Sequence, residues 1–129
     1  MNKLSIPQTS KTPRVSFDPD TGQLLIQGRS IPEDAVGFYR PVMQWLSHYL
    51  QQPSEYTELV VKLEYFNTSS SKCLIDIFRK VEKLHLQGKE ATGSWFYEEA
   101  DEDMKESGED FQELVSMPVG LMVIASEQE

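Results

Sequence analysis

The chain lacks disulfide-forming cysteines, a leader-like start and any long hydrophobic run. It has 129 residues and one cysteine, Cys73, which excludes an internal disulfide. The first residues have no apolar stretch of the kind a secretory signal requires. The longest apolar run is broken by Pro118 and Gly120, and it falls short of the roughly 20 residues that span a bilayer. We therefore expect a cytoplasmic protein with no membrane association.

Positive charge is also scarce. Twelve basic residues stand against 21 acidic ones, giving a formal charge of −9. Because binding to nucleic acid needs clustered Lys and Arg, we expect no nucleic-acid partner. The length suits one compact domain over residues 1–129. Within it, Pro7 and Pro13 predict that residues 1–13 form an extended or mobile arm.

Motifs that carry catalysis or bind cofactors are missing as well. Neither glycine-rich pattern that cradles nucleotide phosphates is present. The two histidines, His48 and His85, belong to no nucleophile motif and have no metal-ligand spacing with Cys73. We expect no catalytic residue, no cofactor and no metal site, and so a protein that is not an enzyme.

What the sequence does contain is an alternation of strand and helix patterns. Strands are predicted near residues 15–17, 24–26, 57–66, 90–97 and 117–124. Helices are predicted from Pro32 to Leu50, from the run at 67–72 to Gly88, and across the acidic segment 98–113. The order β-β-α-β-α-β-α-β predicts a single-domain α/β sandwich with a mixed sheet, because each crossover helix joins parallel strands and the first hairpin is antiparallel.

The sequence also predicts a break in the first helix and the orientation of two aromatic side chains in the strand 57–66. Pro41 lies inside the first helical pattern and should bend that helix or mark a restart. In the strand 57–66, strict alternation places Tyr65 on the same face as Leu63 and places Phe66 with Val60 on the other.

A run of hydroxyl side chains follows that strand. Its residues are Asn67, Thr68, Ser69, Ser70, Ser71 and Lys72. Backbone N–H groups at a helix start lack intrahelical partners and the helix dipole is positive there, so hydroxyls can cap the helix and added negative charge is favoured. The run is therefore a candidate phosphorylation switch. Position alone leaves Thr68, Ser69 and Ser70 open as the modified residue, and leaves Ser69 or Ser70 open as the N-cap.

The acidic block 98–103 has two interpretations. It could attract a basic partner, which would make the protein an acidic scaffold, or it could be the solvated face of a helix. Runs of charge are usually solvated faces, so the second interpretation is favoured without excluding the first.

Four blocks of sequence, in the same order and at similar spacing, resemble the SiaC family of bacterial regulatory phosphoproteins. They cover nearly the whole chain. The blocks are Gly28–Asp34, Phe38–Val42 with Trp45 and Leu46, Tyr65–Lys72, and Trp95–Met104 with Glu106 and Gly108–Phe111 after it.

The resemblance implies a partner-switching role in c-di-GMP signalling. A dedicated protein kinase would phosphorylate Thr68, a PP2C-type phosphatase would reverse the reaction, and the unphosphorylated form would bind and activate a diguanylate cyclase. The architecture is also similar to that of STAS-domain anti-sigma-factor antagonists, which place a phosphorylated hydroxyl at a helix start. That similarity supports a STAS-like fold by analogy, and leaves an antagonist of that kind as an alternative function.

Overall fold

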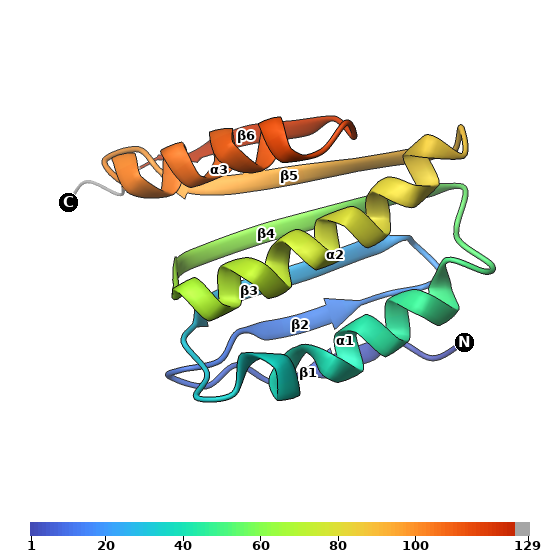
Figure 1. The fold of residues 1–129 in the computed structure, drawn as a ribbon, viewed down its shortest axis with the longest axis horizontal. Coiled ribbons are helices and arrows are strands. Elements are labelled where there is room, and N and C mark those ends of the chain that lie inside the picture. Colours follow the sequence, from blue (N-terminus) through green and yellow to red (C-terminus); the bar gives the residue numbers. More distant parts are fainter. Residues whose placement is uncertain (126–129) are drawn as a thin grey trace.

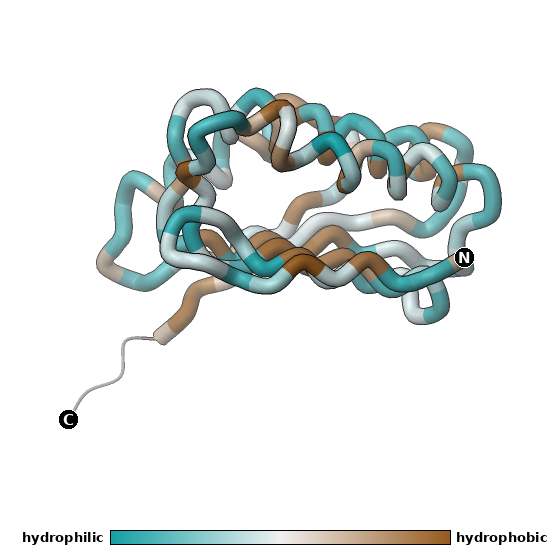
Figure 2. Tube along the Cα trace, turned by 90° about the horizontal axis from the view of Figure 1, so that it is seen from below, coloured by the Kyte–Doolittle hydropathy of each residue, from teal (hydrophilic) through white to brown (hydrophobic). Residues whose placement is uncertain are grey.

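The computed structural model describes residues 1–125, which form two layers. One layer is a six-stranded sheet, and three helices pack together on one of its faces (Figures 1 and 2). The strands are β1 (Leu4–Ile6), β2 (Arg14–Phe17), β3 (Gln23–Ser30), β4 (Tyr56–Phe66), β5 (Glu90–Glu98) and β6 (Val119–Ile124). The helices are α1 (Ala35–Tyr49), α2 (Thr68–Leu86) and α3 (Glu102–Leu114).

The strands lie in the sheet in the order in which they occur in the chain. β1, β2 and β3 are antiparallel neighbours, whereas β3, β4, β5 and β6 are parallel. Each parallel pair is joined through one helix, so the α/β mixed-sheet prediction is confirmed. The additional strand β1 comes from the proline-containing segment 1–13, where its three residues pair with β2. Whether that segment is mobile stays a prediction.

The core lies between the sheet and the helices, and Figure 2 shows hydrophobic residues along the sheet where the two layers face each other. Its largest fully buried side chains are Trp95, Tyr39, Tyr49, Phe17 and Phe78. Apolar residues repeat every second position along β3 and every three or four positions along the helices, so burying these faces against each other removes one continuous apolar surface from water.

One prediction about β4 was wrong. The pairing of β3 with β4 shifts between Gly28 and Arg29, so that Gly28 pairs with Leu63 but Arg29 pairs with Tyr65. This bulge adds a residue to β4, and it inverts the in-and-out alternation beyond it. Tyr65 is therefore exposed, while Phe66 packs against the core.

Pro41 does not mark a restart. α1 is one helix from Ala35 to Tyr49 with Pro41 inside it, and the proline side chain is exposed. α2, which joins β4 to β5, ends before Gly88. The φ of Gly88 is 83°, the left-handed conformation expected of a glycine that follows a helix. No helix within residues 1–125 is long and apolar enough to cross a membrane.

Candidate functional site: the start of helix α2

The hydroxyl run forms the first turn of α2. Asn67 is the N-cap, and its side-chain oxygen accepts a hydrogen bond from the Ser70 backbone N–H at 2.9 Å. Neither Ser69 nor Ser70 caps the helix, which corrects the alternative left open by the sequence. The amide of Asn67 reaches the N–H of the third helical residue with one short side chain, so the serines are free for other roles. Thr68 is the first helical residue, and its side chain is exposed.

Ser70 points the opposite way, into the protein. It is fully buried, and its hydroxyl donates to the Ser30 carbonyl at 3.0 Å and accepts from the Ser30 hydroxyl at 2.8 Å. The Ser30 hydroxyl also lies 2.6 Å from the Tyr39 hydroxyl. Because the Ser30 hydroxyl donates its one proton to Ser70, Tyr39 is the donor in the Ser30–Tyr39 hydrogen bond. A buried relay of hydroxyls thus ties together α1, the end of β3 and the start of α2.

Burial raises the pKa of Tyr39 to about 12. Loss of solvation is the larger effect and outweighs the hydrogen bond with the Ser30 side chain, which acts in the opposite direction. Tyr39 is therefore neutral at any physiological pH, and it keeps the proton that it donates to Ser30. The relay has a fixed direction as a result.

The backbone of the turn is held by the same anchor. The Asn67 N–H donates to the Ser30 carbonyl at 3.0 Å, and the Ser71 N–H donates to the Asn67 carbonyl at 3.0 Å. The side chain of Ser71 is only partly exposed. Thr68 therefore lies on a turn that is fixed on both sides, with its own side chain directed away from the relay and toward solvent.

Thr68 opens onto a shallow groove between the first turns of α1 and α2. The groove holds about 690 Å³ and is lined by Asn67, Thr68, Ser69 and Lys72 together with residues from both helices; these are Val36, Cys73 and Asp76. Val36 is a large apolar side chain that is 66% exposed, next to the hydroxyl. A single exposed apolar residue is ordinary on a protein surface, so Val36 adds an apolar contact to the groove but does not by itself mark an interface.

The charges around Thr68 are mixed. Lys72 lies one helical turn beyond it and is exposed, while Asp76 is one turn further on. The helix dipole adds partial positive charge at the same end. An anion on Thr68 would have Lys72 and the helix start nearby, with Asp76 as the closest opposing carboxylate in the groove.

The Cys73 thiol, which also lines the groove, is not activated as a nucleophile. Cys73 is partly buried against the core, and burial, with smaller effects from Asp76 and Asp34, raises the pKa of its thiol. A protonated thiol is a weak nucleophile. Within residues 1–125, no group of three or more His, Cys, Asp or Glu side chains is arranged to hold a metal ion.

Sequence reasoning found the hydroxyl run but missed the residues that support it. Ser30, Tyr39 and Val36 come from β3 and α1, and nothing in their local sequence indicates that they meet the start of α2. Ser30 and Ser70 are 40 positions apart. Only the parallel pairing of β3 with β4 brings the end of one strand beside the helix that follows the other.

The fold and the site define a small α/β domain with a threonine hydroxyl exposed at the start of a helix. The model of the SiaC family of regulatory phosphoproteins matches residues 6–124. The chain therefore belongs to this family of regulatory proteins.

Known relatives agree with this assignment. An uncharacterised protein of Pseudomonas aeruginosa (strain UCBPP-PA14) is 34% identical over 121 residues, covering 94% of this chain and 96% of the relative. The crystal structure of apo-SiaC from P. aeruginosa has a TM-score of 0.87 at 33% identity, covering 95% of this chain and 99% of that one.

A second similar structure also contains another protein. It is the crystal structure of the P. aeruginosa diguanylate cyclase SiaD in complex with its activator SiaC. The matched chain has a TM-score of 0.89 at 33% identity, covering 94% of this chain and 99% of that one. A relative with nearly the same fold thus assembles with a diguanylate cyclase.

Proposed function

We propose that this protein is a non-enzymatic switch that binds and activates a diguanylate cyclase when Thr68 is free, and that phosphorylation of Thr68 blocks binding. One observation carries the proposal: Thr68 is exposed at the start of α2, on a turn fixed by buried hydrogen bonds and beside an exposed apolar residue. The complex of a relative with its cyclase supports the choice of partner.

The choice of Thr68 over its neighbours rests on exposure and geometry. Ser70 is fully buried and engaged by Ser30, so a kinase could reach it only after the turn opens. Ser69 is exposed, but its hydroxyl donates to the N-cap oxygen of Asn67 at 3.2 Å. Thr68 is exposed, and none of its side-chain atoms takes part in the hydrogen bonds of the cap.

The chemistry belongs to the partner enzymes. A protein kinase would bring ATP to the folded turn, where the Thr68 hydroxyl oxygen attacks the γ-phosphorus, its proton passes to a base of the kinase, and ADP leaves. A PP2C-type phosphatase would hydrolyse the ester and return threonine and inorganic phosphate. The switch protein supplies the hydroxyl and the surface on which it is recognised.

The phosphoryl group would block docking through its charge. It adds about −1.5 to −2 charges at neutral pH. Within this chain, Lys72 and the helix start can balance that charge, so the fold is kept. Against a partner surface that covers Val36, the same dianion would lose its water without compensation. A coupling of about 3 kcal/mol would weaken binding more than a hundredfold.

The proposal predicts different behaviour for three variants. Thr68→Ala should bind a SiaD-type diguanylate cyclase like the unmodified protein, because neither carries a charge at position 68. Thr68→Glu should bind about tenfold or more weakly, since one carboxylate imitates only part of a phosphate. Isothermal titration gives the affinities, and formation of c-di-GMP from GTP measures activation.

Ser69→Ala is the matched control, because it removes an exposed hydroxyl one residue away. It should bind and activate normally. Intact-mass and peptide mapping after incubation with ATP and the kinase should place one phosphate on Thr68. Equal affinity of the Thr68→Ala and Thr68→Glu variants, or a phosphate found on another residue, would contradict the proposal.

A further inference from the structure

The two edges of the sheet are built differently. β1, at one edge, has only three residues, and Lys3 and Pro7 flank it directly. Short strands, lysines and prolines are the usual means by which proteins prevent an edge from pairing with another chain. β6, at the other edge, has six residues from Val119 to Ile124, and none of them is charged or a proline. Its Met122, Val123 and Ile124 are exposed by 44, 55 and 40%.

The backbone of β6 offers hydrogen-bonding groups outward. Two hydrogen bonds show which groups point toward β5. The Gly93 N–H donates to the Pro118 carbonyl at 2.8 Å, and the Glu99 N–H donates to the Ile124 carbonyl at 3.2 Å. Groups of alternate residues point to opposite sides of a strand. The N–H and C=O groups of the odd-numbered residues Val119, Leu121 and Val123 therefore point away from the sheet.

One of these outward groups is already occupied, which confirms the direction. The Gln112 side chain in α3 donates to the Val119 carbonyl at 2.7 Å. Leu121 and Val123 have no such partner among residues 1–125, because β6 pairs only with β5 in the sheet. They present two N–H and two C=O groups at the spacing that an added strand uses.

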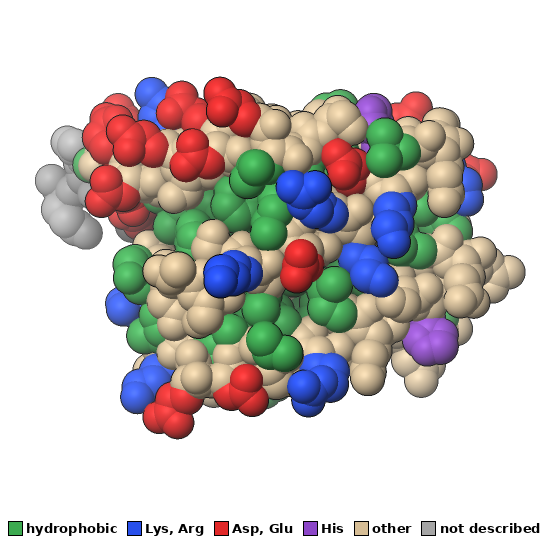
Figure 3. All heavy atoms as spheres, in the orientation of Figure 1, with side chains coloured by type: hydrophobic (Ala, Val, Ile, Leu, Met, Phe, Trp, Pro, Cys, Tyr) green, Lys and Arg blue, Asp and Glu red, His purple; other side chains and the backbone are tan. Residues whose placement is uncertain are grey.

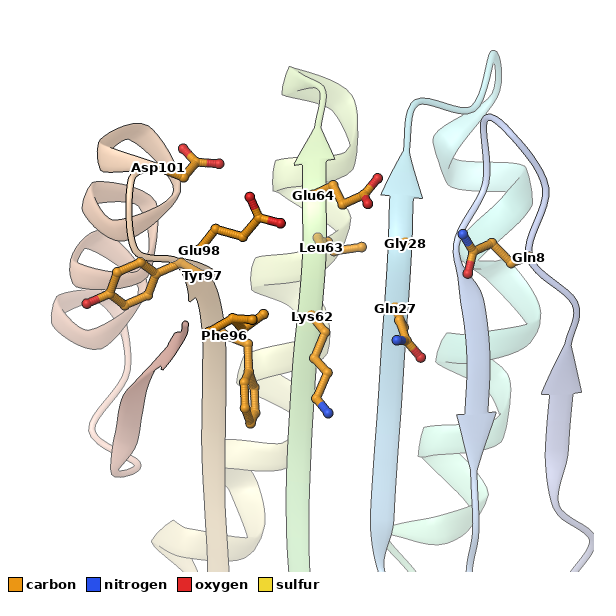
Figure 4. A pocket seen from close by; sticks show the side chains of 11 residues that line it. Gln8, Gln27, Gly28, Lys62, Leu63, Glu64, Phe96, Tyr97, Glu98 and Asp101 are labelled. Atoms are coloured by element: carbon orange, nitrogen blue, oxygen red, sulfur yellow. The ribbon is translucent and has the colours of Figure 1, made fainter. Parts of the chain in front are cut away.

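Charge surrounds this open stretch. On the helix side, α3 carries six carboxylates against Lys105, and Figure 3 shows acidic side chains gathered over this helix. On the other face of the sheet, Glu98 pairs with Ile124 in register and lies beside Phe96 and Glu64 (Figure 4). Lys62 lies on that same face, with its Nζ 4.5 Å from the centre of the Phe96 ring. The edge is thus an apolar strip that is strongly acidic on the α3 side and mixed in charge on the other.

A second copy of the chain is a poor occupant of this edge. Antiparallel pairing of β6 with β6 of another copy would place the two α3 helices in the same layer on either side of the two-fold axis. Each α3 carries six carboxylates, so their repulsion opposes that dimer. A positively charged strand meets the opposite situation, because the carboxylates of α3 attract it.

We propose that β6 is a docking edge for an extended segment of a basic partner protein, which adds to the sheet as a seventh strand. Its backbone would pair with Leu121 and Val123. Apolar side chains on one face of the segment would contact Met122 and Ile124, and Lys or Arg on its other face would lie next to α3. The proposal does not depend on Thr68, which is in a different part of the helix layer.

A pair of short synthetic peptides tests this edge on the full chain. One alternates lysine and valine, and the other alternates glutamate and valine. The lysine peptide should bind about tenfold more tightly than the glutamate peptide, and its affinity should fall as salt is added. On binding, it should shift the NMR signals of the Leu121 and Val123 amide protons and slow the exchange of these protons with solvent. Val123→Lys should weaken binding about tenfold, since it places a charge at the edge.

Ser5→Lys on β1 is the matched control, because it puts the same charge on the opposite edge, and it should leave binding unchanged. Thr68→Glu should also leave it unchanged, which separates this proposal from the switch. Lack of binding by the lysine peptide, equal binding of both peptides, or shifts located away from β6 would overturn the proposal. So would sedimentation showing a dimer of the chain that Val123→Lys dissociates, because the occupant would then be a second copy.

Discussion

At the scale of single residues, neighbouring side chains with the same chemistry have opposite tasks. Thr68 and Ser69 are exposed, whereas Ser70 is fully buried and bonded twice to Ser30. Successive residues in a helix are about 100° apart, so a run of hydroxyls necessarily points some into the protein and some to solvent. The inward hydroxyl of Ser70 fixes the turn, and the hydroxyl of Thr68 is exposed to solvent.

Ser70→Ala should destabilise the protein by about 1 to 3 kcal/mol. The substitution leaves the buried Ser30 hydroxyl without its acceptor, and an unsatisfied buried group costs that much. Urea unfolding followed by circular dichroism measures the change. Ser69→Ala, which removes an exposed hydroxyl, should change the free energy of unfolding by less than about 0.5 kcal/mol. Equal effects of the two substitutions would contradict the buried relay.

Tyr39 should make stability depend on pH at the alkaline end. Its pKa is raised from 10.0 to about 12 in the fold, so folding favours the protonated form. The resulting stabilisation is fully present below about pH 10, and it is lost as the pH rises toward 12, amounting to about 2 to 3 kcal/mol. Tyr39→Phe should lack this part of the decline. Measuring the free energy of unfolding of both proteins across this pH range cancels the titration of other groups. If the two free energies fell in parallel with pH, the raised pKa of Tyr39 would be refuted.

At the scale of elements, all three helices begin in the same way. Asp34, Asn67 and Asp101 are the N-caps, and each side chain accepts from the backbone N–H three residues on. These caps are local in sequence, although the hydroxyl run favoured Ser69 or Ser70 over Asn67 as the cap of α2. How closely a helix approaches the sheet is a different matter, and in α3 it depends on Gly108.

Gly108→Ala should move α3 away from the sheet. A Cβ at this position would lie 2.5 Å from a Trp95 ring carbon and 2.6 Å from a Leu121 methyl carbon. The steric cost of about 1 to 3 kcal/mol exceeds the helix propensity that alanine gains, so a net loss of about 1 to 2 kcal/mol is expected. Thermal unfolding and the fluorescence of Trp95 report it.

Gly120→Ala provides the control for that substitution. The nearest atom to its Cβ would be the Met122 sulfur at 3.9 Å, which is ordinary contact. Alanine there should leave stability unchanged or raise it slightly, because glycine weakens strand interiors. A stable Gly108→Ala protein with unaltered Trp95 fluorescence would mean that α3 is not held as closely as the structure indicates.

At the scale of the whole molecule, the two-layer architecture separates charges that the net value of −9 conceals. α2 carries Lys72, Arg79, Lys80 and Lys83, and Figure 3 shows basic side chains over the middle of the helix layer. α3 carries six of the 21 acidic residues and lies at one end of the helix layer. The candidate switch and the acidic edge are therefore separate surfaces of the molecule.

The sequence predicted the order of elements because each one has its own periodicity. Alternation along 24–26 and the three- and four-residue steps of α2 are local signals. The bulge in β4 was not predicted, since it depends on how Gly28 and Leu63 pair across two strands. The wrong placement of Tyr65 and Phe66 followed directly from that missing contact.

The sequence by itself determined the α/β fold class, the position of α2 and the presence of hydroxyls at its start, because these follow from patterns within short stretches of chain. Only the tertiary structure decided that Ser70 is buried against Ser30 and Tyr39, and that β6 is an open edge next to the acidic helix α3. Those features arise where segments far apart in the chain pack together, and burial then sets which hydroxyl bonds inward and which faces solvent.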